Sequence, residues 1–348
     1  MSVGNRAKPG LPAVQRSNLG LGKVDKLLGV ARYFMRKGLA PSTLKSYDAA
    51  WNGYVTFCSG VSVSPCPVNI AVLCAFISER VLIKDMQFSS ISVLVAGIQF
   101  HARCRDPSAG SLFSNPSVRL LLNGIKRSKP MRRDSRLPPS TTSLYSMVNQ
   151  LRRGRFGSFL DKMLEAVLLV AFFGFLRIGE FSTASRIFDP NRNLRIADVT
   201  FHDSSLSIML RMSKTDKEGN GSAVSIARTN TVFCPFASMS SYLAARDAMS
   251  ANEPLFITGA GVPMTKAWFA ARFRLLCNWC GLDARRYTPH SLRIGGTTAM
   301  ADFVSPATLM SMGRWSSCAF ERYIRPSNAD SINAQVRLSS AALPSSSH

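Results

Sequence analysis

The chain has 348 residues, of which 46% are hydrophobic, so it can bury a sizeable core and is long enough for two domains. Its 43 lysines and arginines outnumber 20 aspartates and glutamates, which gives a formal net charge of +23. This excess makes a polyanion the expected partner and favours nucleic acid over a membrane surface. The longest apolar stretch, Met163–Leu176, contains Glu165 and is too short to span a bilayer, so no transmembrane helix is expected.

The first third of the chain is predicted to be helical. Residues 1–21 carry basic side chains without a following apolar run, which predicts a flexible basic arm and not a signal peptide. Residues 22–128 have apolar side chains at helical spacing without a strand signal, which predicts a small helical domain with a basic exposed face. The predicted helices cover Lys23–Arg36, a segment that begins at Pro41, Val68–Ile83, Ser89–Arg103 and Pro116–Arg127.

Aromatic residues mark one face of the predicted helix that begins at Pro41. Tyr47, Trp51, Tyr54 and Phe57 recur at a spacing of three or four residues. Such a face is more often core than a platform for stacked bases, so we expect these rings to be buried. Lys45 on the same helix is a candidate contact to DNA.

A basic, proline-containing segment follows the helical domain. Residues 126–136 hold six positive residues and one acid, and Leu137-Pro138-Pro139 follows them. Because proline cannot continue a helix, residues 129–140 are predicted to be an extended linker. It could be a solvated charge run, but a basic domain on each side favours a strap along a DNA backbone. The candidate contacts are Lys126, Arg127, Lys129, Arg132 and Arg133.

The remainder combines helices with a few short strands. Leu160–Leu176 is predicted to be a long apolar helix, and three β-rich segments with intervening turns predict a small antiparallel sheet. The strands are Ala197–His202, Leu206–Met212 and Ala223–Ala227, and the later helices are Pro235–Met249, Thr265–Cys280, Pro289–Asp302 and Pro306–Met312. The fold class is therefore mainly α with a small antiparallel sheet (α+β). Cys277 and Cys280 have metal-like spacing, but no second pair accompanies them and no metal site is predicted.

A His-x-x-Arg pair stands at the start of a predicted helix. Thr288 can cap this helix, Pro289 suits its first position, and His290 and Arg293 then share one face. The free N–H groups and partial positive charge of a helix N-terminus suit a phosphate. An isolated pair of this kind is more often an ordinary surface feature, so other residues must support the interpretation.

Arg177 gives that support, because it closes a strongly apolar predicted helix where an unpaired guanidinium would be costly to bury. It needs an anion. Glu180 could be a structural ion-pair partner, or a phosphodiester could bind Arg177 while Glu180 orients the guanidinium. The residues leave the two readings open.

Two further residues could perform proton transfer and nucleophilic attack. Lys214 stands in the turn between two predicted strands, where a mobile lysine could act as a general acid, and Lys217 competes for this role. Tyr323 is surrounded in sequence by arginines, whose field could lower the pKa of its hydroxyl and make it a nucleophile.

Taken together in order, these motifs resemble the tyrosine recombinases (phage integrases). The wording of "FFGFLRIGEF", "SKTD", "CPFASMSSYL", "HSLRIGGTTAM" and "GRWSS" looks closest to the recombinases of DIRS-like retrotransposons and Crypton-like elements. The resemblance covers roughly residues 22–330, with the N-terminal part supported by pattern only.

The resemblance implies a helical core-binding domain, a catalytic domain over residues 141–330 and a tail over 331–348. Tyr323 would attack a DNA phosphodiester and leave a 3′-phosphotyrosyl link, with Arg177 and Arg293 stabilising the transition state. Lys214 would protonate the departing 5′-oxygen, and His290 would assist proton transfer. No metal, ATP or other cofactor is implied, because the covalent intermediate keeps the energy of the broken bond.

One position departs from the commonest pattern of that family. Where many members have His or Trp, nine residues before the tyrosine, this chain has Arg314, followed by Trp315. Which of the two fills the sixth active-site role stays open. Gly295, Gly296 and Gly313 are predicted to allow close approach of the helices and of DNA.

The predicted function is site-specific recombination or integration of a mobile element. Its partner would be double-stranded DNA, bound by a homotetramer across two sites, with no membrane partner, in the nucleus of a eukaryotic host and otherwise in the cytoplasm. The alternatives are a catalytically idle DNA-binding protein derived from such an element and a type IB topoisomerase.

Overall fold

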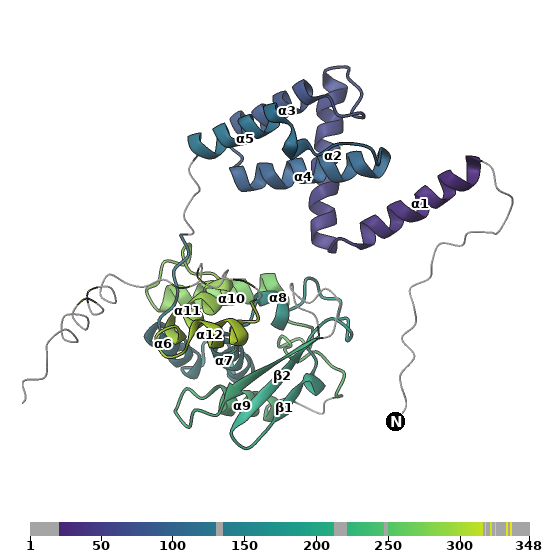
Figure 1. Ribbon diagram of the computed structural model, residues 1–348. Coiled ribbons are helices and arrows are strands. Elements are labelled where there is room, and N and C mark those ends of the chain that lie inside the picture. The colour runs from purple at the N-terminus through teal and green to yellow at the C-terminus, as the bar shows by residue number, and fades with distance from the viewer. Residues whose placement is uncertain are drawn as a thin grey trace, which may run out of the picture. The chain divides into compact units, whose positions relative to one another are not determined.

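The computed structural model describes residues 21–129, 135–211, 221–246 and 250–315, and the single residues 317, 321, 324, 332 and 335. The chain divides into two compact units, Met1–Arg133 and Asp134–His348, drawn in Figure 1. Within the described residues, no helix combines the length and apolar character needed to cross a membrane.

The first unit consists of helices. They are α1 (Leu21–Lys37), α2 (Pro41–Gly60), α3 (Ile70–Leu82), α4 (Phe88–Arg105) and α5 (Pro116–Ser128), with a short 3-10 turn η1 (Leu112–Ser114) before α5. The side chain of Asn69 caps α3 by accepting from the Val72 N–H, and the side chain of Asn115 caps α5 in the same way. The helices predicted in this region are confirmed.

The core of this unit lies where α2 and α4 meet. Trp51 and Tyr54 of α2 are buried, together with Phe76 of α3. Gly97 of α4 lies so close to α2 that an added Cβ would stand 2.9 Å from the Cβ of Ala50. The aromatic face of α2 is therefore core, as predicted.

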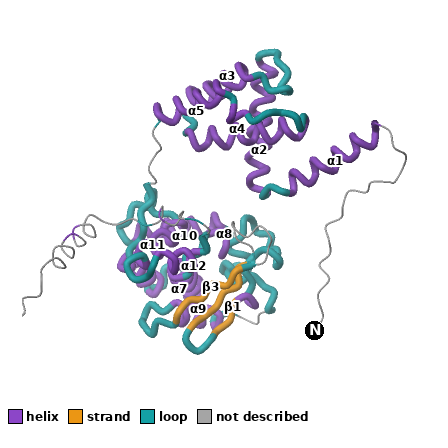
Figure 2. The backbone as a smooth tube through the Cα atoms, in the orientation of Figure 1, coloured by secondary structure: helices purple, strands orange, loops and turns teal. Residues whose placement is uncertain are grey.

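The second unit combines helices with a three-stranded sheet. Its elements are α6 (Thr141–Arg152), α7 (Ser158–Phe173), α8 (Ile178–Phe181), η2 (Ile196–Asp198), β1 (Val199–Phe201), β2 (Ser205–Leu210), β3 (Ser222–Ala227), α9 (Pro235–Ala244), α10 (Lys266–Trp279), α11 (Pro289–Met300) and α12 (Pro306–Gly313). The strands are antiparallel in the order β1-β2-β3, and Leu206 pairs with Phe201 on one side and with Ile226 on the other (Figure 2). The predicted fold class is confirmed.

Helix α6 was not among the predicted helices. Its buried residues Leu144, Met147, Val148 and Leu151 have the spacing of one helix face, and Ser140 caps its start by accepting from the Ser143 N–H. The signal was therefore in the sequence, immediately after the proline pair of the linker.

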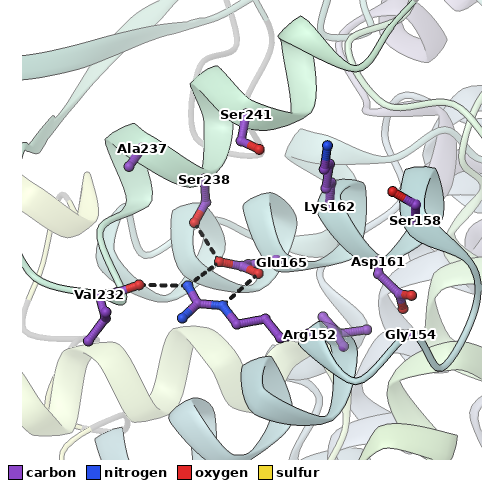
Figure 3. Close-up of a pocket in the computed structure, with 11 residues that line it drawn as sticks. Arg152, Gly154, Ser158, Asp161, Lys162, Glu165, Val232, Ala237, Ser238 and Ser241 are labelled. Atoms are coloured by element: carbon purple, nitrogen blue, oxygen red, sulfur yellow. Dashed lines mark hydrogen bonds and ion pairs between the residues drawn. The ribbon is translucent and has the colours of Figure 1, made fainter.

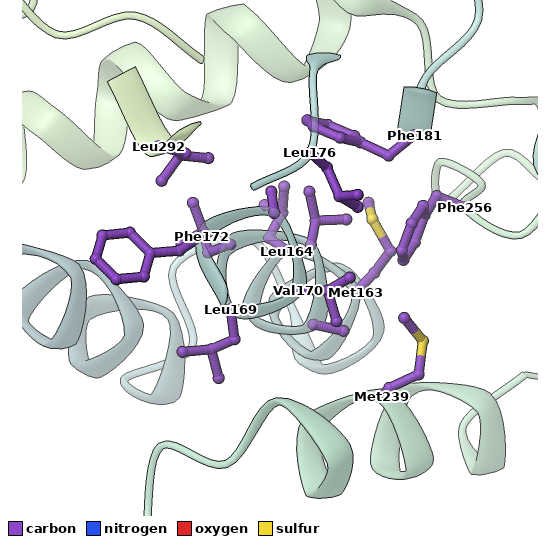
Figure 4. Close-up of a cluster of buried hydrophobic side chains, with 14 of the residues drawn as sticks. Met163, Leu164, Leu169, Val170, Phe172, Leu176, Phe181, Met239, Phe256 and Leu292 are labelled. Carbon is purple, nitrogen blue, oxygen red and sulfur yellow. The ribbon is translucent and has the colours of Figure 1, made fainter. Parts of the chain in front are cut away.

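Helix α7 is the centre of this unit. Its residues from Ala166 to Phe172 are all buried, which explains why its sequence is apolar on every face. Figure 4 shows its side chains among Leu292 of α11, Met239 of α9, and Phe181 and Phe256. Burial of each such side chain contributes about 1.5–3 kcal/mol, so α7 is a rigid base for the segments at its C-terminal end.

The predicted helix Leu160–Leu176 is too long, because α7 ends at Phe173. Phe175 has φ 50°, in the left-handed region, and the chain turns there. Gly174 precedes it at a crowded point, where an added Cβ would lie 2.8 Å from the Val170 carbonyl oxygen. Arg177 therefore does not close the apolar helix as predicted but is the N-cap residue of α8. Likewise α9 ends at Ala244 and not at Met249, and residues 247–249 lie outside the described part.

Candidate active site

Arg177 and Glu180 form an ion pair at the start of α8. The Arg177 backbone N–H donates to Glu180 Oε2 at 2.8 Å, and its Nη1 donates to Glu180 Oε1 at 2.8 Å. The Glu180 side chain is 3% exposed and that of Arg177 is 18% exposed. The structural partner that the sequence offered is thus present, and it leaves the guanidinium partly open to solvent.

Arg314 joins the same carboxylate from a distant segment of the second unit. It follows α12 in a left-handed conformation, φ 56° and ψ 45°, and its Nη2 donates to Glu180 Oε2 at 2.9 Å. The side chain is 10% exposed. Burial lowers the pKa of Arg314, Glu180 opposes this shift, and the nearby positive charge of Arg177 adds to it.

Arg293 is fully buried beside this cluster. Its Nη1 donates to the Phe175 carbonyl oxygen, and its Nη2 donates to the Gly313 carbonyl oxygen at 2.7 Å. The Phe175 carbonyl oxygen also accepts from Arg314 Nη2 at 3.3 Å. The turn between α7 and α8 therefore binds both arginines through a backbone oxygen.

Trp315 packs on Arg293. The Arg293 Cζ atom lies 4.4 Å from the centre of the Trp315 ring, which is the geometry of a cation–π contact. The ring covers Gly313, where an added Cβ would overlap it. A small residue at 313 is therefore required for Trp315 to reach Arg293.

Helix α11 is held between α7 and the end of the linker. An added Cβ on Gly296 would overlap the Phe172 carbonyl oxygen, and one on Gly295 would overlap that of Pro139. The linker end is fixed in turn, because the Leu137 N–H donates to the Arg286 carbonyl oxygen at 2.9 Å. Close approach is therefore found, but to α7 and to Pro139. The predicted approach to the segment of Tyr323, which lies outside the described residues, and to DNA stays a prediction.

His290 stands in the first turn of α11, one turn before Arg293. Thr288 is the N-cap residue and Pro289 is the first residue of the helix, as predicted. The Thr288 N–H donates to Ser291 Oγ at 3.0 Å, which fixes this helix start. The His290 side chain is half-buried.

The structure brings five of the predicted site residues into one cluster. They are Arg177, Glu180, Arg293, Arg314 and Trp315. Lys214, its competitor Lys217 and the predicted nucleophile Tyr323 lie outside the described residues, as do Arg132 and Arg133. The sequence interpretation missed the backbone carbonyl groups of Gly174 and Phe175, which accept from Arg314 and Arg293. Gly174 was the available signal for a turn at this place.

The remaining DNA-binding candidates lie on the first unit. Lys45 of α2 and Arg127 of α5 are exposed. Lys126 Nζ lies 5.7 Å from the centre of the Phe88 ring. Lys129 Nζ donates to Asp85 Oδ1 at 2.5 Å and to the Val81 carbonyl oxygen at 3.1 Å, so it ties the end of α5 to that of α3. Contacts of these residues to DNA stay predictions.

A cavity of about 530 Å³ lies between α6, α7 and α9 (Figure 3). Glu165 accepts from Arg152 Nη2 at 2.6 Å and from Ser238 Oγ at 2.9 Å at its wall. None of the predicted site residues lines this cavity. The cluster around Glu180 is therefore the candidate active site, and the cavity is a separate feature.

Proteins of similar sequence and of similar fold are known for this chain. No family model matches the chain. An integrase/recombinase XerD homolog of Selenomonas ruminantium is 23% identical over 324 residues, which cover 90% of each chain.

Solved structures share the fold at lower identity. The XerH recombinase bound to a palindromic difH substrate, in a post-cleavage complex, is 14% identical with a TM-score of 0.59, over 92% of this chain and 83% of that one. A lambda integrase dimer bound to a COC′ core site is 13% identical with a TM-score of 0.57, over 87% and 77%. The Tn1549 transposon integrase in complex with circular intermediate DNA is 15% identical with a TM-score of 0.52, over 79% and 87%. The chain is thus similar in sequence to an integrase/recombinase XerD homolog along nearly its whole length, and it shares its fold with solved recombinase and integrase structures.

Proposed function

We propose that this protein is a site-specific DNA recombinase or integrase of a mobile element, which cleaves and rejoins DNA through a 3′-phosphotyrosyl intermediate. The observation that carries the proposal is the gathering of Arg177, Arg293 and Arg314 around the single carboxylate of Glu180 and the Phe175 carbonyl oxygen. Three guanidinium groups against one carboxylate leave an excess of positive charge in a mostly buried place. Such an excess stabilises a phosphate on which negative charge accumulates during reaction.

The proposed reaction is a transesterification. The Tyr323 hydroxyl oxygen forms a bond to the scissile phosphorus, the bond from phosphorus to the 5′-oxygen breaks, and the 5′-hydroxyl leaves with a proton supplied by Lys214. Arg177 and Arg293 bind the non-bridging oxygens, and His290 assists the removal of the proton that the Tyr323 hydroxyl loses as it attacks. Rejoining is the same step in reverse, with a 5′-hydroxyl from the partner strand as the nucleophile.

Several features support DNA as the substrate and a mobile element as the setting. The chain carries a net charge of +23, and the solved XerH, lambda and Tn1549 proteins were all captured with DNA. The Tn1549 protein is a transposon integrase. A homotetramer acting on two DNA sites, in the nucleus of a eukaryotic host, belongs to the same proposal, as does kinship with DIRS-like and Crypton-like recombinases.

A nicked suicide duplex made from the DNA that flanks the gene tests the proposal. Once Tyr323 has attacked, the short leaving strand dissociates and the protein stays covalently attached, which denaturing electrophoresis detects. We expect the adduct with the wild type and with Tyr145→Phe, a control at an aromatic stack on Phe233, and no adduct with Tyr323→Phe. An adduct that persists in Tyr323→Phe would refute the assigned nucleophile. Absence of any adduct would favour the alternative of a catalytically idle DNA-binding protein. Relaxation of supercoiled DNA without recombinant products would indicate a type IB topoisomerase.

A further inference from the structure

The guanidinium of Arg314 has little capacity left for a ligand. An arginine offers five N–H donors. Nη1 of Arg314 donates to the carbonyl oxygens of Gly174 at 3.2 Å and Met312 at 3.4 Å. Nη2 donates to the Phe175 carbonyl oxygen at 3.3 Å and to Glu180 Oε2 at 2.9 Å. Each of the four hydrogens on the two terminal nitrogens therefore has an acceptor, and Nε, which has none among the described residues, is buried.

Arg177 differs from Arg314 in this respect. Within the described part of the chain its guanidinium donates to protein through Nη1 alone, and its side chain is 18% exposed against 10% for Arg314. Arg177 can thus turn other N–H groups toward a phosphate without giving up its bond to Glu180. Arg314 could bind a phosphate only by breaking bonds to the protein.

The backbone at Arg314 fits a supporting role. Arg314 and Phe175 are both non-glycine residues in the left-handed region, which costs roughly 1–2 kcal/mol for each. The bonds from Arg314 to the carbonyl oxygens of Gly174 and Phe175 join these two turns, so each conformation is held by the other. The end of α12 is thereby fixed to the turn that carries Arg177.

We infer that Arg314 is a positioning residue and not a phosphate ligand: it holds Glu180 and the turn between α7 and α8 in place, so that Arg177 can bind the scissile phosphate. This inference rests on the proposed function. It assigns a role to the position at which this chain departs from the His or Trp of other members. Trp315, which stacks on Arg293, is then the residue of the pair that contacts a phosphate-binding arginine directly.

A methylphosphonate at the scissile position distinguishes the two roles. It replaces a charged non-bridging oxygen with a methyl group, so a cation that balances this charge becomes dispensable, whereas a residue that positions the site does not. The variants are Arg314→Gly and Arg314→Asn, because glycine and asparagine adopt the left-handed conformation readily. Arg177→Ala is the control for a phosphate ligand, because Arg177 has N–H groups that can turn toward a phosphate. Single-turnover cleavage by each protein is compared with that of the wild type on the normal and the modified duplex.

We expect Arg177→Ala to recover at least tenfold relative to the wild type on the methylphosphonate, and both Arg314 variants to be slowed by the same factor on the two duplexes. Recovery of the Arg314 variants to the extent shown by Arg177→Ala would overturn the inference. If thermal melting shows that they do not fold, Arg314→Lys, which can keep the bond to Glu180, is tested in the same way with the same two outcomes.

A double-mutant cycle adds a second readout. If Arg314 acts through Glu180, the double variant Arg314→Gly/Glu180→Gln should lose about as much cleavage rate as the slower of the two single variants. If the two residues act independently, the fold-losses in cleavage rate should multiply. A wild-type protein that cleaves neither duplex would refute the proposed function, and with it the inference. That result is distinct from selective recovery of an Arg314 variant.

Discussion

Two buried carboxylates of the second unit have nearly the same local surroundings. Glu180 and Asp198 each stand three residues after an arginine that caps a short helix, Arg177 and Arg195. Each accepts the backbone N–H of that arginine, at 2.8 Å and 2.9 Å, and also pairs with its guanidinium. Each then receives a second arginine, Arg314 for Glu180 and Arg211 for Asp198.

The difference lies in what surrounds the two pairs. Arg195 also donates to Asn252 at 2.7 Å, and Arg211, at the end of β2, is 31% exposed, so Asp198 ties the sheet to a surface loop. Glu180 instead lies beside α11, where the buried Arg293 shares the Phe175 carbonyl oxygen with Arg314. The same pair of an arginine and an acid three residues later thus supports a surface connection at Asp198 and a cationic site at Glu180. The residues that pack around each pair decide between these two roles.

The largest effect on cleavage is expected from Arg293→Lys. Lysine keeps the charge but loses the planar fork that donates to two oxygens, so cleavage should fall on the order of 10²-fold in a single-turnover assay. Arg246→Lys is the matched control, because Arg246 is also buried and donates to the carbonyl oxygens of Pro254 and Leu255. Equal losses in the two variants would mean that Arg293 only supports the fold.

Glu180→Gln is expected to slow cleavage by about tenfold, which corresponds to about 1.4 kcal/mol of transition-state stabilisation. The amide keeps the shape of the side chain but removes its charge and replaces one acceptor oxygen with a donor that faces Arg177 or Arg314. Binding of DNA, measured by gel shift at fixed salt, should change little, because the arginines remain. An unchanged cleavage rate would contradict the role given to Glu180.

Asp198→Asn should leave cleavage nearly unchanged and act on stability. Its side chain is 2% exposed and serves two arginines, so loss of its charge should lower the free energy of unfolding by roughly 3 kcal/mol. Chemical unfolding of the purified variant measures this, with cleavage assayed well below the transition. A loss of cleavage like that of Glu180→Gln would make the two carboxylates equivalent and remove the contrast drawn between them.

The smallest effect concerns a third carboxylate, on the first unit. The half-buried Asp48 pairs with Arg36 and accepts from His101 Nε2 at 2.9 Å, while Arg105 Nη1 lies 3.3 Å from His101 Nδ1. Burial lowers the pKa of His101; Asp48 opposes this shift, and Arg105 adds to it. The unfolded chain then binds the proton first, so stability is complete above about pH 6.5 and falls as the pH drops toward the folded value.

This dependence should appear as a lower melting temperature of the first unit at pH 5.5 than at pH 7.5. In His101→Gln the difference should shrink, since glutamine does not titrate. A difference of the same size in the variant would assign the pH dependence to other groups. The variant His101→Gln is expected to cleave DNA at the wild-type rate, because Arg293 belongs to the other unit.

Part of the site was predictable because its signals are local. Pro289 at the first position of α11 and the three-residue step from His290 to Arg293 fix the helix and the shared face within one turn of chain. The ion pair of Arg177 with Glu180 is another short-range feature, since three residues separate the partners. The alternating pattern of β2 and the apolar run of α7 likewise needed only neighbouring residues.

The sequence by itself therefore determined the helices, the small sheet, the cationic character and the order of the candidate residues. Only the tertiary structure decided that Arg177 starts a helix instead of closing one, and that Arg314 joins Glu180 across 134 residues of chain. The physical reason is the distance along the chain over which each interaction acts. Periodicity and capping act over one or two turns, whereas the left-handed turns at Phe175 and Arg314 exist because packing from distant segments compensates their cost.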